Sequence, residues 1–589
     1  MRRDPRLAKG ERQNALWGRR GENRGNALWG SGKRRMVLLA VAATLVVPVA
    51  GSAAPRSASS RSGAPDQTLL QLAAANPDKV FEVIVQTRGS AGKGRAADAI
   101  ASALRTHPGK ARGLKKQFTV ISGGAAELTG AQIVDLAARK DVVAITLDAP
   151  MTASGNGNTT TTTSTTLSTC PCAFEGVYWP YVTGVTGFWQ KPGAKAAPAP
   201  QAPTIAVIDS GVDSANPIFG GRVVKEVTLT SLSPNAAGDG RGHGTFVAGL
   251  AAGMVSNWGG SSPTSKIVSL DVLNDKGKGM TSDVIAAADW IYEHKAEYGI
   301  RVANFSLHAE GESSFLEDPL DKAVERLWLS GVVVVAASGN YGEDGQPSGV
   351  LYAPANDPFV ITVGSVDLHG TQDLGDDFNS PWSSYGSTPD GFSKPELGAP
   401  GRYMIGAVPT AGTMPTERPD RVIGPGYMWM SGTSFAAPVV AGAAADLLAI
   451  HPGWTPDQVK GALMASARAL PAAAPGSVGV GEVKLDAAAL IAAPPNPNLA
   501  LERFLMADPL EGSTLVFDAA SWAEAARDSA SWDSASWAEA SWSNASWAEA
   551  SWSDASWATA SWAEASWADA SWADGEDGTH SWPDLSWLD

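Results

Sequence analysis

Cysteine is nearly absent from this chain, which excludes a fold held together by a disulfide framework. Its 589 residues include two cysteines, Cys170 and Cys172, which are separated by one proline. A bridge between residues two apart is geometrically strained, so a bridged pair and a surface loop with free or intermolecular thiols both remain open. Further metal-ligating residues are not found nearby, and we expect no two-ligand metal site there. With 44% hydrophobic residues, the chain can instead form a large core.

Basic residues are scarce at the C-terminal end. Residues 521–589 hold thirteen acidic residues and one basic residue, which gives a charge of −12, whereas the whole chain carries −15. The rest of the chain therefore carries −3, which is ordinary for a soluble protein. Because nucleic-acid binding relies on basic surfaces that contact phosphates, we expect no nucleic acid as a partner.

The apolar run at the N-terminus is short. Lys33-Arg34-Arg35 precedes the apolar residues 36–50, and the small residues Gly51-Ser52-Ala53 follow. These are the three parts of a secretory signal, and the run is too short for a comfortable membrane span. An uncleaved anchor is the alternative. We predict an arm and secretory signal in 1–53, a linker in 54–80, and an extracellular protein, either free or associated with the cell envelope.

Three short stretches each hold one member of an acid–base–nucleophile set. They are Ile-Asp-Ser-Gly with Asp209, Gly-His-Gly-Thr with His243, and Gly-Thr-Ser-Phe-Ala-Ala-Pro with Ser434. A serine hydroxyl is a weak nucleophile at neutral pH, so it needs an imidazole to take its proton and a carboxylate to orient that imidazole. A serine at the start of a helix is also close to unpaired N–H groups, which stabilise an oxyanion.

The order Asp, His, Ser and the flanking residues resemble the subtilisin-like serine peptidases. The resemblance covers residues 200–492 well and residues 80–150 more loosely. It implies a secreted serine endopeptidase that acts on protein or peptide substrates through an acyl-enzyme and needs no cofactor for catalysis. Asn340, in Ala-Ala-Ser-Gly-Asn, matches the family's oxyanion donor.

Residues 200–492 alternate buried-strand runs with helical patterns. Strands are expected at 204–208, 266–270, 332–335 and 360–363, and helices at 281–298 and 315–330. Such alternation predicts an α/β fold with a doubly wound, mostly parallel sheet that helices cover on both faces. Active sites in such sheets lie at the carboxyl ends of strands, and Asp209 directly follows one.

A second, smaller unit precedes this domain. Residues 81–150 show a β-α-β-β-α-β pattern, which is typical of a ferredoxin-like α+β unit. By resemblance, this unit is a prosegment that assists folding and inhibits the active site until it is removed; an ordinary accessory domain is the alternative. Residues 151–199 begin with a Thr/Ser-rich linker and lead into the mature region. We expect self-processing around Asp148–Ser154, because exposed linkers concentrate proteolysis.

The resemblance also implies two extended segments that pair with a substrate peptide. The matching residues are Gly277, Gly279, Ser306, Leu307 and His308. The family usually has glycine where this chain has His308. A side chain there would narrow the first or fourth subsite, or favour an acidic substrate residue if it were protonated, so we assign no side-chain preference.

The calcium site common in the family is expected to be absent, and no metal-ligating residue is assigned. Where the family has an aspartate after His-Pro, this chain reads Asn216-Pro217-Ile218, and residues 259–263 replace an Asn-rich calcium loop. Ile218 offers only a backbone carbonyl, a poor replacement for a carboxylate. Structural calcium at other sites stays open.

The C-terminal part is a repeat. After a predicted linker at 493–520, residues 521–589 repeat Ala-Ser-Trp-x-x and hold twelve of the 22 tryptophans. A five-residue period matches neither a helix nor a strand, so a loose resemblance to pentapeptide-repeat β-solenoids and a disordered acidic tail both remain open. The tail suggests a rival function, a protein that binds a cell envelope, a glycan or a partner and uses its peptidase domain mainly to mature itself.

Overall fold

The structure is a computed structural model that describes residues 67–88, 94–153, 171–189, 201–255, 258–508 and 515–528. The predicted secretory signal in 1–53, most of the Thr/Ser-rich linker and the repeat tail beyond residue 528 lie outside the described residues.

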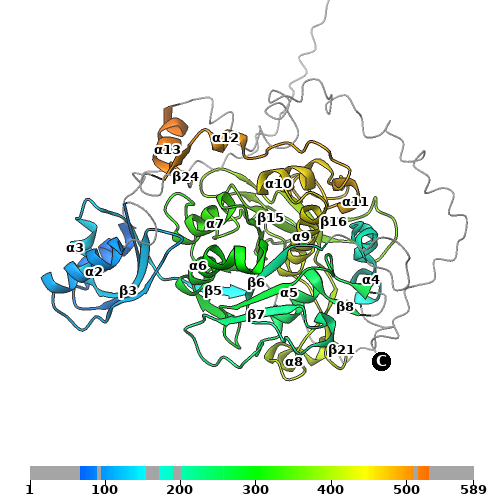
Figure 1. Cartoon of the computed structure of the whole chain (residues 1–589), viewed down its shortest axis with the longest axis horizontal. Helices are drawn as coiled ribbons and strands as arrows, with labels where there is room; N and C mark the ends of the chain where they lie inside the picture. Colours follow the sequence, from blue (N-terminus) through cyan, green and yellow to red (C-terminus); the bar gives the residue numbers. More distant parts are fainter. Residues whose placement is uncertain are drawn as a thin grey trace, which may run out of the picture. The chain divides into compact units, whose positions relative to one another are not determined.

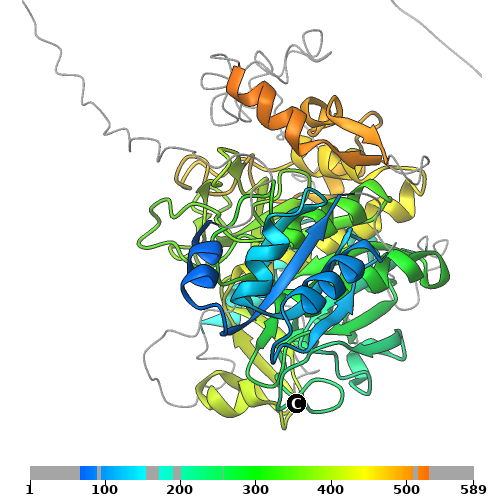
Figure 2. The ribbon, with the colours of Figure 1, turned by 90° about the vertical axis from the view of Figure 1, so that its left-hand side faces the viewer.

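The first described part, residues 67–153, is called the N-terminal unit. Its elements are α1 (Gln67–Ala75), β1 (Val80–Thr87), α2 (Arg95–Thr106), β2 (Gly113–Gln117), β3 (Gly123–Thr129), α3 (Gly130–Ala137), β4 (Val142–Leu147) and β5 (Pro150–Ala153). The strands β2-β3-β1-β4 form an antiparallel sheet, and Figure 2 shows the blue helices in front of these strands. Thr129 and Gln132 form the capping box that starts α3.

The linker predicted at 54–80 is wrong at its C-terminal end. Helix α1 lies inside this range, and its Leu69 and Ala73 are buried in the same apolar cluster as Ile133 of α3. Gly130 fits so closely beneath α1 that a Cβ there would lie 2.2 Å from the carbonyl oxygen of Ala73. The N-terminal unit therefore begins at or before residue 67.

Strand β5 leaves the N-terminal unit and joins a different sheet. It lies between β11 (Lys278–Met280) and β13 (Leu307–Ala309) and pairs antiparallel with both. Part of the predicted linker at 151–199 is thus ordered. The same range also contains α4 (Cys172–Val182) and the short 3-10 helix Val185–Phe188.

The main domain, residues 201–492, has the predicted α/β fold. Its central sheet has the order β16-β15-β14-β12-β6-β10-β7, with β19 also paired to β15. The strands are β6 (Thr204–Asp209), β7 (Val223–Thr228), β10 (Ile267–Asp271), β12 (Ile300–Phe305), β14 (Val333–Ala337), β15 (Ile361–Asp367), β16 (Phe378–Asn379) and β19 (Leu397–Pro400). All pairs are parallel except β15 with β16.

Helices cover both faces of this sheet, as the sequence predicts (Figure 1). Helices α5 (His243–Ala252) and α9 (Thr433–Ile450) pack against each other, and so do α6 (Thr281–Tyr298) and α7 (Pro319–Leu329). Helix α10 (Pro456–Ala465) packs beside α9. Among the described residues, α9 alone is long and apolar enough to cross a membrane, but 89% of its apolar window is buried inside the protein. We identify α9 as the central core helix.

The linker predicted at 493–520 is also ordered in its described part. This part and the first residues of the tail, together 493–528, are called the C-terminal segment. It contains α12 (Leu499–Glu502), the hairpin β23 (Leu505–Ala507) and β24 (Leu515–Phe517), and α13 (Ala519–Asp528). Figure 2 shows the hairpin and α13, in orange, next to each other. The first repeat unit of the tail is thus helical, which fits neither a β-solenoid nor disorder at this point.

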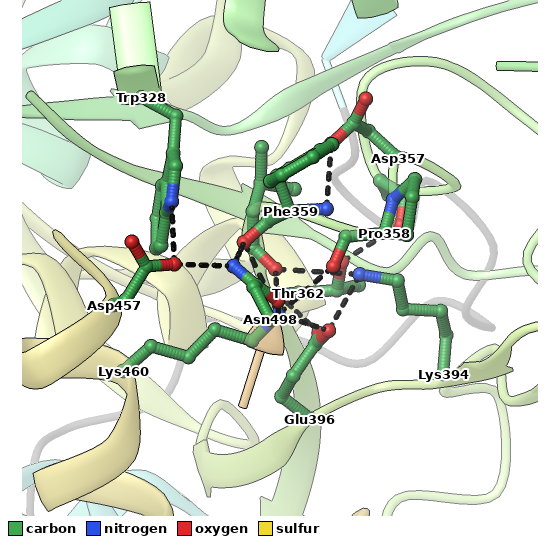
Figure 3. Close-up of polar contacts among 12 residues, drawn as sticks. Trp328, Asp357, Pro358, Phe359, Thr362, Lys394, Glu396, Asp457, Lys460 and Asn498 are labelled. Atoms are coloured by element: carbon green, nitrogen blue, oxygen red, sulfur yellow. Dashed lines mark hydrogen bonds and ion pairs between the residues drawn. The ribbon is translucent and has the colours of Figure 1, made fainter. Parts of the chain in front are cut away.

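A buried polar network holds the start of the C-terminal segment in the main domain (Figure 3). Lys460 donates to the carbonyl oxygens of residues 358–360 at 3.0–3.1 Å and to Asn498 Oδ1 at 3.2 Å. Its ammonium lies 2.9 Å from Glu396, and Lys394 lies 2.6 Å from the same carboxylate. Asn498 Nδ2 in turn donates to Asp457 at 2.7 Å. The segment is therefore part of the domain's packing.

The structure selects one of the two states left open for the cysteines. Cys172 is disulfide-bonded and fully buried, so it is no free thiol on a surface loop. It packs with Val177 and Ile405. Cys170 lies outside the described residues.

Candidate active site

Asp209 and His243 form a buried acid–base pair. Asp209 is the last residue of β6, and His243 is the first residue of α5. The imidazole Nδ1 lies 2.7 Å from Asp209 Oδ1 and 3.0 Å from Oδ2. The helix approaches the strand end closely, since a Cβ on Gly244 would lie 1.9 Å from the carbonyl oxygen of Gly211. Glycine after the histidine is therefore required for this contact.

A third buried residue, Asp239, fixes the backbone around this pair. Its carboxylate accepts from the N–H of Gly242 at 2.7 Å and from Thr245 N–H and Oγ1 at 2.8 and 2.6 Å. Ser210 Oγ donates to it at 2.9 Å. Burial raises the pKa of Asp239 to about 6. Sequence reasoning missed Asp239, although an aspartate four residues before the histidine was visible.

Ser434 lies in the first turn of α9 and is fully buried. Its Oγ donates to the carbonyl oxygen of Ser306 at 3.0 Å, and Ser306 Oγ donates to the carbonyl oxygen of Ser434 at 2.8 Å. His243 Nε2 is buried without a hydrogen-bond partner, and its ring lies 5.3 Å from that of Phe435. The structure thus places His243 beside Phe435, the residue after Ser434, while the Ser434 hydroxyl donates to Ser306 instead of to His243. Catalytic hydrogen bonds often form only with substrate present.

Asn340 lies next to the start of α9. It follows β14, and its Oδ1 accepts from Thr433 N–H at 3.0 Å and from Thr433 Oγ1 at 3.2 Å. Gly339 N–H donates to the same Thr433 hydroxyl at 3.2 Å. Because the carboxamide oxygen is held by the residue before Ser434, the orientation of the whole Asn340 amide is set relative to the nucleophile.

The two segments expected to pair with a substrate pair here with β5. Leu307 and His308 lie opposite Ala153 and Thr152, and Gly279 lies opposite Met151. Gly277 accepts from Ala153 N–H at 3.3 Å. Ser306 precedes β13 and bonds to Ser434 as described. An extended strand of this chain therefore occupies the place predicted for a peptide.

His308 is part of a cluster of three rings that sequence reasoning missed. Tyr341 Oη lies 3.0 Å from His308 Nε2, and the rings of Tyr341 and Tyr352 are 4.8 Å apart. Burial lowers the pKa of His308 below its ordinary value, so the imidazole is neutral at pH 7. A charged His308 that favours acidic substrate residues has no support from this geometry.

No group of three or more His, Cys, Asp or Glu side chains within the described ranges is placed to hold a metal ion. Asn216 accepts from Ile218 N–H at 3.2 Å and caps the 3-10 helix Pro217–Phe219. The absence of the family's common calcium site stays a prediction.

Comparisons with known proteins place this geometry in a family. The model of the Subtilase family matches residues 201–481. The serine protease AprX of Bacillus subtilis (strain 168) is 34% identical over 266 residues, which are 44% of this chain and 59% of AprX. Subtilisin amylosacchariticus of Bacillus subtilis subsp. amylosacchariticus is 35% identical, over 45% of this chain and 60% of that protein. The chain thus spans less than two thirds of the length of these two relatives.

Two further matches concern a shorter relative and a solved structure. The crystal structure of fervidolysin from Fervidobacterium pennivorans, a keratinolytic enzyme related to subtilisin, has a TM-score of 0.51 and 22% identity; the match covers 71% of this chain and 62% of fervidolysin. At this identity it supports the fold alone. Subtilisin of Bacillus pumilus is 35% identical over 265 residues, which are 45% of this chain and 82% of that subtilisin. The chain belongs to the subtilase family.

Proposed function

We propose that the protein is a serine endopeptidase that hydrolyses peptide bonds with Asp209, His243 and Ser434. One observation carries the proposal. The buried Asp209–His243 pair lies beside the helix start that bears Ser434, and an extended peptide strand is already held at β11 and β13.

The catalytic steps follow from these positions. The Ser434 hydroxyl turns from the carbonyl of Ser306 to His243 Nε2, which takes its proton as Oγ attacks the scissile carbonyl. Asp209 holds the Nδ1–H and stabilises the imidazolium. The Asn340 amide and the Ser434 N–H donate to the oxyanion, an interaction worth about 3–4 kcal/mol per donor in the transition state. His243 then protonates the leaving amine, and water cleaves the acyl-enzyme.

The N-terminal unit acts in this proposal as an intramolecular inhibitor. Strand β5 occupies both substrate-binding segments, and Glu310 N–H donates to the carbonyl oxygen of Pro150 at 2.9 Å. Because β5 pairs as far as Ala153, we expect self-processing within a few residues of that position, at the C-terminal end of the Asp148–Ser154 range. Sequencing the N-terminus of the mature protein, with Ser434→Ala as the unprocessed control, locates the bond. Processing of Ser434→Ala in a purified sample would show that another protease acts.

A fluorophosphonate probe tests the reaction itself. We expect labelling at Ser434 in the processed wild type and none in Ser434→Ala or His243→Ala, because the probe reacts with an activated serine. Asp239→Asn should keep some labelling, since its role is to hold the loop. Labelling of the His243→Ala variant at the wild-type rate would contradict the proposed general base.

Export is part of the same proposal. The signal predicted in 1–53 and the extracellular location are tested by comparing full-length chain with a variant that lacks residues 36–50. We expect only the full-length chain outside the cell. Equal export of both would remove the signal from the proposal.

A further inference from the structure

The first repeat unit of the tail is inserted into an aromatic site on the main domain. Trp522 is stacked on Phe392 at 5.6 Å and contacts Phe315 edge-on at 5.4 Å between ring centroids. Phe517 of β24 lies 5.8 Å from Phe315 and completes this site, which we call the aromatic seat. Trp522 is 6% exposed there. The contact belongs to the class of buried aromatic anchors that dominate binding interfaces.

The main domain holds the seat in a fixed shape. Asp390 accepts from Ser314 Oγ at 2.6 Å and from the Phe315 N–H at 3.0 Å, which ties the loop before α7 to the loop that bears Phe392. The Phe392 N–H donates to Thr388 Oγ1 at 3.1 Å. These two amide protons depend on the order of the seat, so they also serve as reporters of it.

The start of the inserted helix α13 is capped by a side chain. Asp518 precedes α13, and its carboxylate accepts from Ser521 N–H at 3.0 Å and from Ser521 Oγ at 2.5 Å. This hydrogen bonding lowers the pKa of Asp518. Ala523, the next residue, is also buried. We call residues 518–525, Asp-Ala-Ala-Ser-Trp-Ala-Glu-Ala, the plug.

The plug recurs in the tail. Residues 533–540 read Asp-Ser-Ala-Ser-Trp-Ala-Glu-Ala and differ from the plug at one position of eight. Its hexapeptide Ala-Ser-Trp-Ala-Glu-Ala occurs twice more, in 543–550 after Ser543 and in 558–565 after Ala558. Aspartate and serine are good residues at the start of a helix and alanine is a poor one. Of these three recurrences, 533–540 alone keeps the tryptophan together with the aspartate that caps the plug, whereas 543–550 has serine at that position and 558–565 has alanine.

We propose that residues 533–540 of the same chain are a second ligand of the aromatic seat and replace the plug when Trp522 leaves it. Either of two segments of the tail, which start fifteen residues apart, would then occupy the aromatic seat. The connection from the seat to residue 533 is short, with an expected r.m.s. span of about 20 Å if flexible, so the effective concentration of the second ligand is on the order of millimolar. A second copy of the chain cannot match this at micromolar concentration. The proposal does not depend on catalytic activity.

Hydrogen–deuterium exchange on the full chain tests it, with Ser434→Ala in every sample to prevent self-digestion. In Trp522→Ala, we expect the Phe315 and Phe392 amides to lose less than about threefold of their protection, because Trp537 enters the seat. In Trp522→Ala with Trp537→Ala, we expect a loss of more than about tenfold. Phe392→Ala shows how the reporter at Phe315 behaves when the seat itself is damaged.

The matched control is Trp522→Ala with Trp562→Ala, which removes the tryptophan of the unit that lacks a cap. We expect it to behave like Trp522→Ala alone. The proposal fails if Trp522→Ala alone exposes the seat as fully as the Trp537 double variant, or if the Trp562 double variant does the same. Protection in Trp522→Ala that rises with protein concentration would assign the ligand to a second copy and would also overturn it.

Discussion

The two ends of the described chain contact the main domain by different physical means. The N-terminal unit meets it through a strand and through carboxylates on α6, whereas the C-terminal segment enters it with an asparagine and a tryptophan. If the N-terminal unit leaves as we propose, we expect water to replace it at the polar groups that it bonds to. When the C-terminal segment leaves, charged groups stay behind in the core. If the N-terminal unit is removed as we propose, this difference explains how the C-terminal segment can remain.

The N-terminal unit contacts the main domain mostly through hydrogen bonds to polar groups that water could replace. Thr119 N–H and Oγ1 donate to Asp289 at 2.9 and 3.1 Å, Lys116 pairs with Asp283, and Gln86 Nε2 donates to the carbonyl oxygen of Glu317 at 2.8 Å. Phe118 and Ile121 add an apolar contact with the core of the main domain. On release of the N-terminal unit, hydrogen bonds to water would replace most of these hydrogen bonds, because a protein hydrogen bond contributes only about 1 kcal/mol net.

The C-terminal segment meets charges that cannot reach water. Lys394, Glu396 and Lys460 are all buried. Burial lowers the pKa of Lys394 to about 8. Burial alone would raise the pKa of Glu396, but the two lysines lower it. Asn498 supplies one of the oxygens that bind Lys460, and its loss would leave part of a buried charge without a partner.

The largest loss of stability is expected for a substitution of Lys460. Lys460→Met removes one cation from Glu396 and leaves three carbonyl groups and Asn498 without their donor. Breaking a buried ion pair costs about 3–5 kcal/mol, whereas Lys116→Met at the N-terminal unit should cost less, because Lys116 is partly exposed and Asp283 keeps its hydrogen bonds from Ser231. Urea unfolding of both variants in a Ser434→Ala background measures the difference.

The exposed Lys276 supplies the control, as Lys276→Met changes the same residue type without a buried partner. Asn498→Ala should fall between the two, at about 1–3 kcal/mol, the cost of a buried group without its hydrogen bond. If Lys460→Met costs no more than Lys276→Met, the C-terminal segment is not held by this network.

The N-terminal unit and the C-terminal segment also differ in how far the sequence predicts them. The strands and helices of 81–150 have a local period, and capping residues such as Thr129 mark their ends, so their order could be predicted. The insertion of Trp522 depends on Phe315 and Phe392, which lie more than a hundred residues away in sequence. A five-residue period carries no information about such a contact, and the segment was therefore assigned to a linker and a tail.

The active site shows the same limit. Asp209, His243 and Ser434 lie in short motifs whose residue types follow from the chemistry, so the sequence alone was sufficient to identify them as candidates. Asp239 was missed because its role is to bind backbone N–H groups, a role that any nearby aspartate could have. Tyr341 and Tyr352 were missed because only the fold brings them to His308.

A second prediction concerns the pH dependence of the N-terminal contact. Burial raises the pKa of Asp289 to about 6 while the N-terminal unit is bound, and Glu293 adds to this effect. Release exposes the carboxyl and returns its pKa to the ordinary range. The bound state therefore takes up a proton on acidification, so its contribution to binding is full below the ordinary pKa and is lost as the pH rises through 6.

From Asp289 alone, we expect the N-terminal unit to bind the main domain about tenfold more weakly at pH 7.5 than at pH 5. The measurement is inhibition of the processed enzyme by added N-terminal unit at the two pH values. Asp289→Asn keeps an acceptor for Thr119 and should flatten the pH dependence, while Glu293→Gln should change it less. Burial also raises the pKa of Asp148, so a remaining slope in Asp289→Asn of the same sign is expected. An unchanged slope would remove Asp289 from the explanation.

The smallest effect is expected at β13, the strand with which we propose that both the N-terminal unit and a substrate pair. His308 lies on β13 opposite Thr152, and its ring contacts Tyr341 directly after Asn340. His308→Gly removes a ring from this cluster, so the turnover of peptides with large side chains should rise several-fold relative to those with small ones, within the range of pocket effects on kcat/KM. Competition assays with paired peptides measure the ratio. Since burial lowers the pKa of His308, the wild type should show no gain for acidic peptides between pH 8 and pH 7. A gain at pH 7 that disappears in His308→Gly would mean that the imidazole is charged when substrate binds, and that the cluster opens to water once β5 has left.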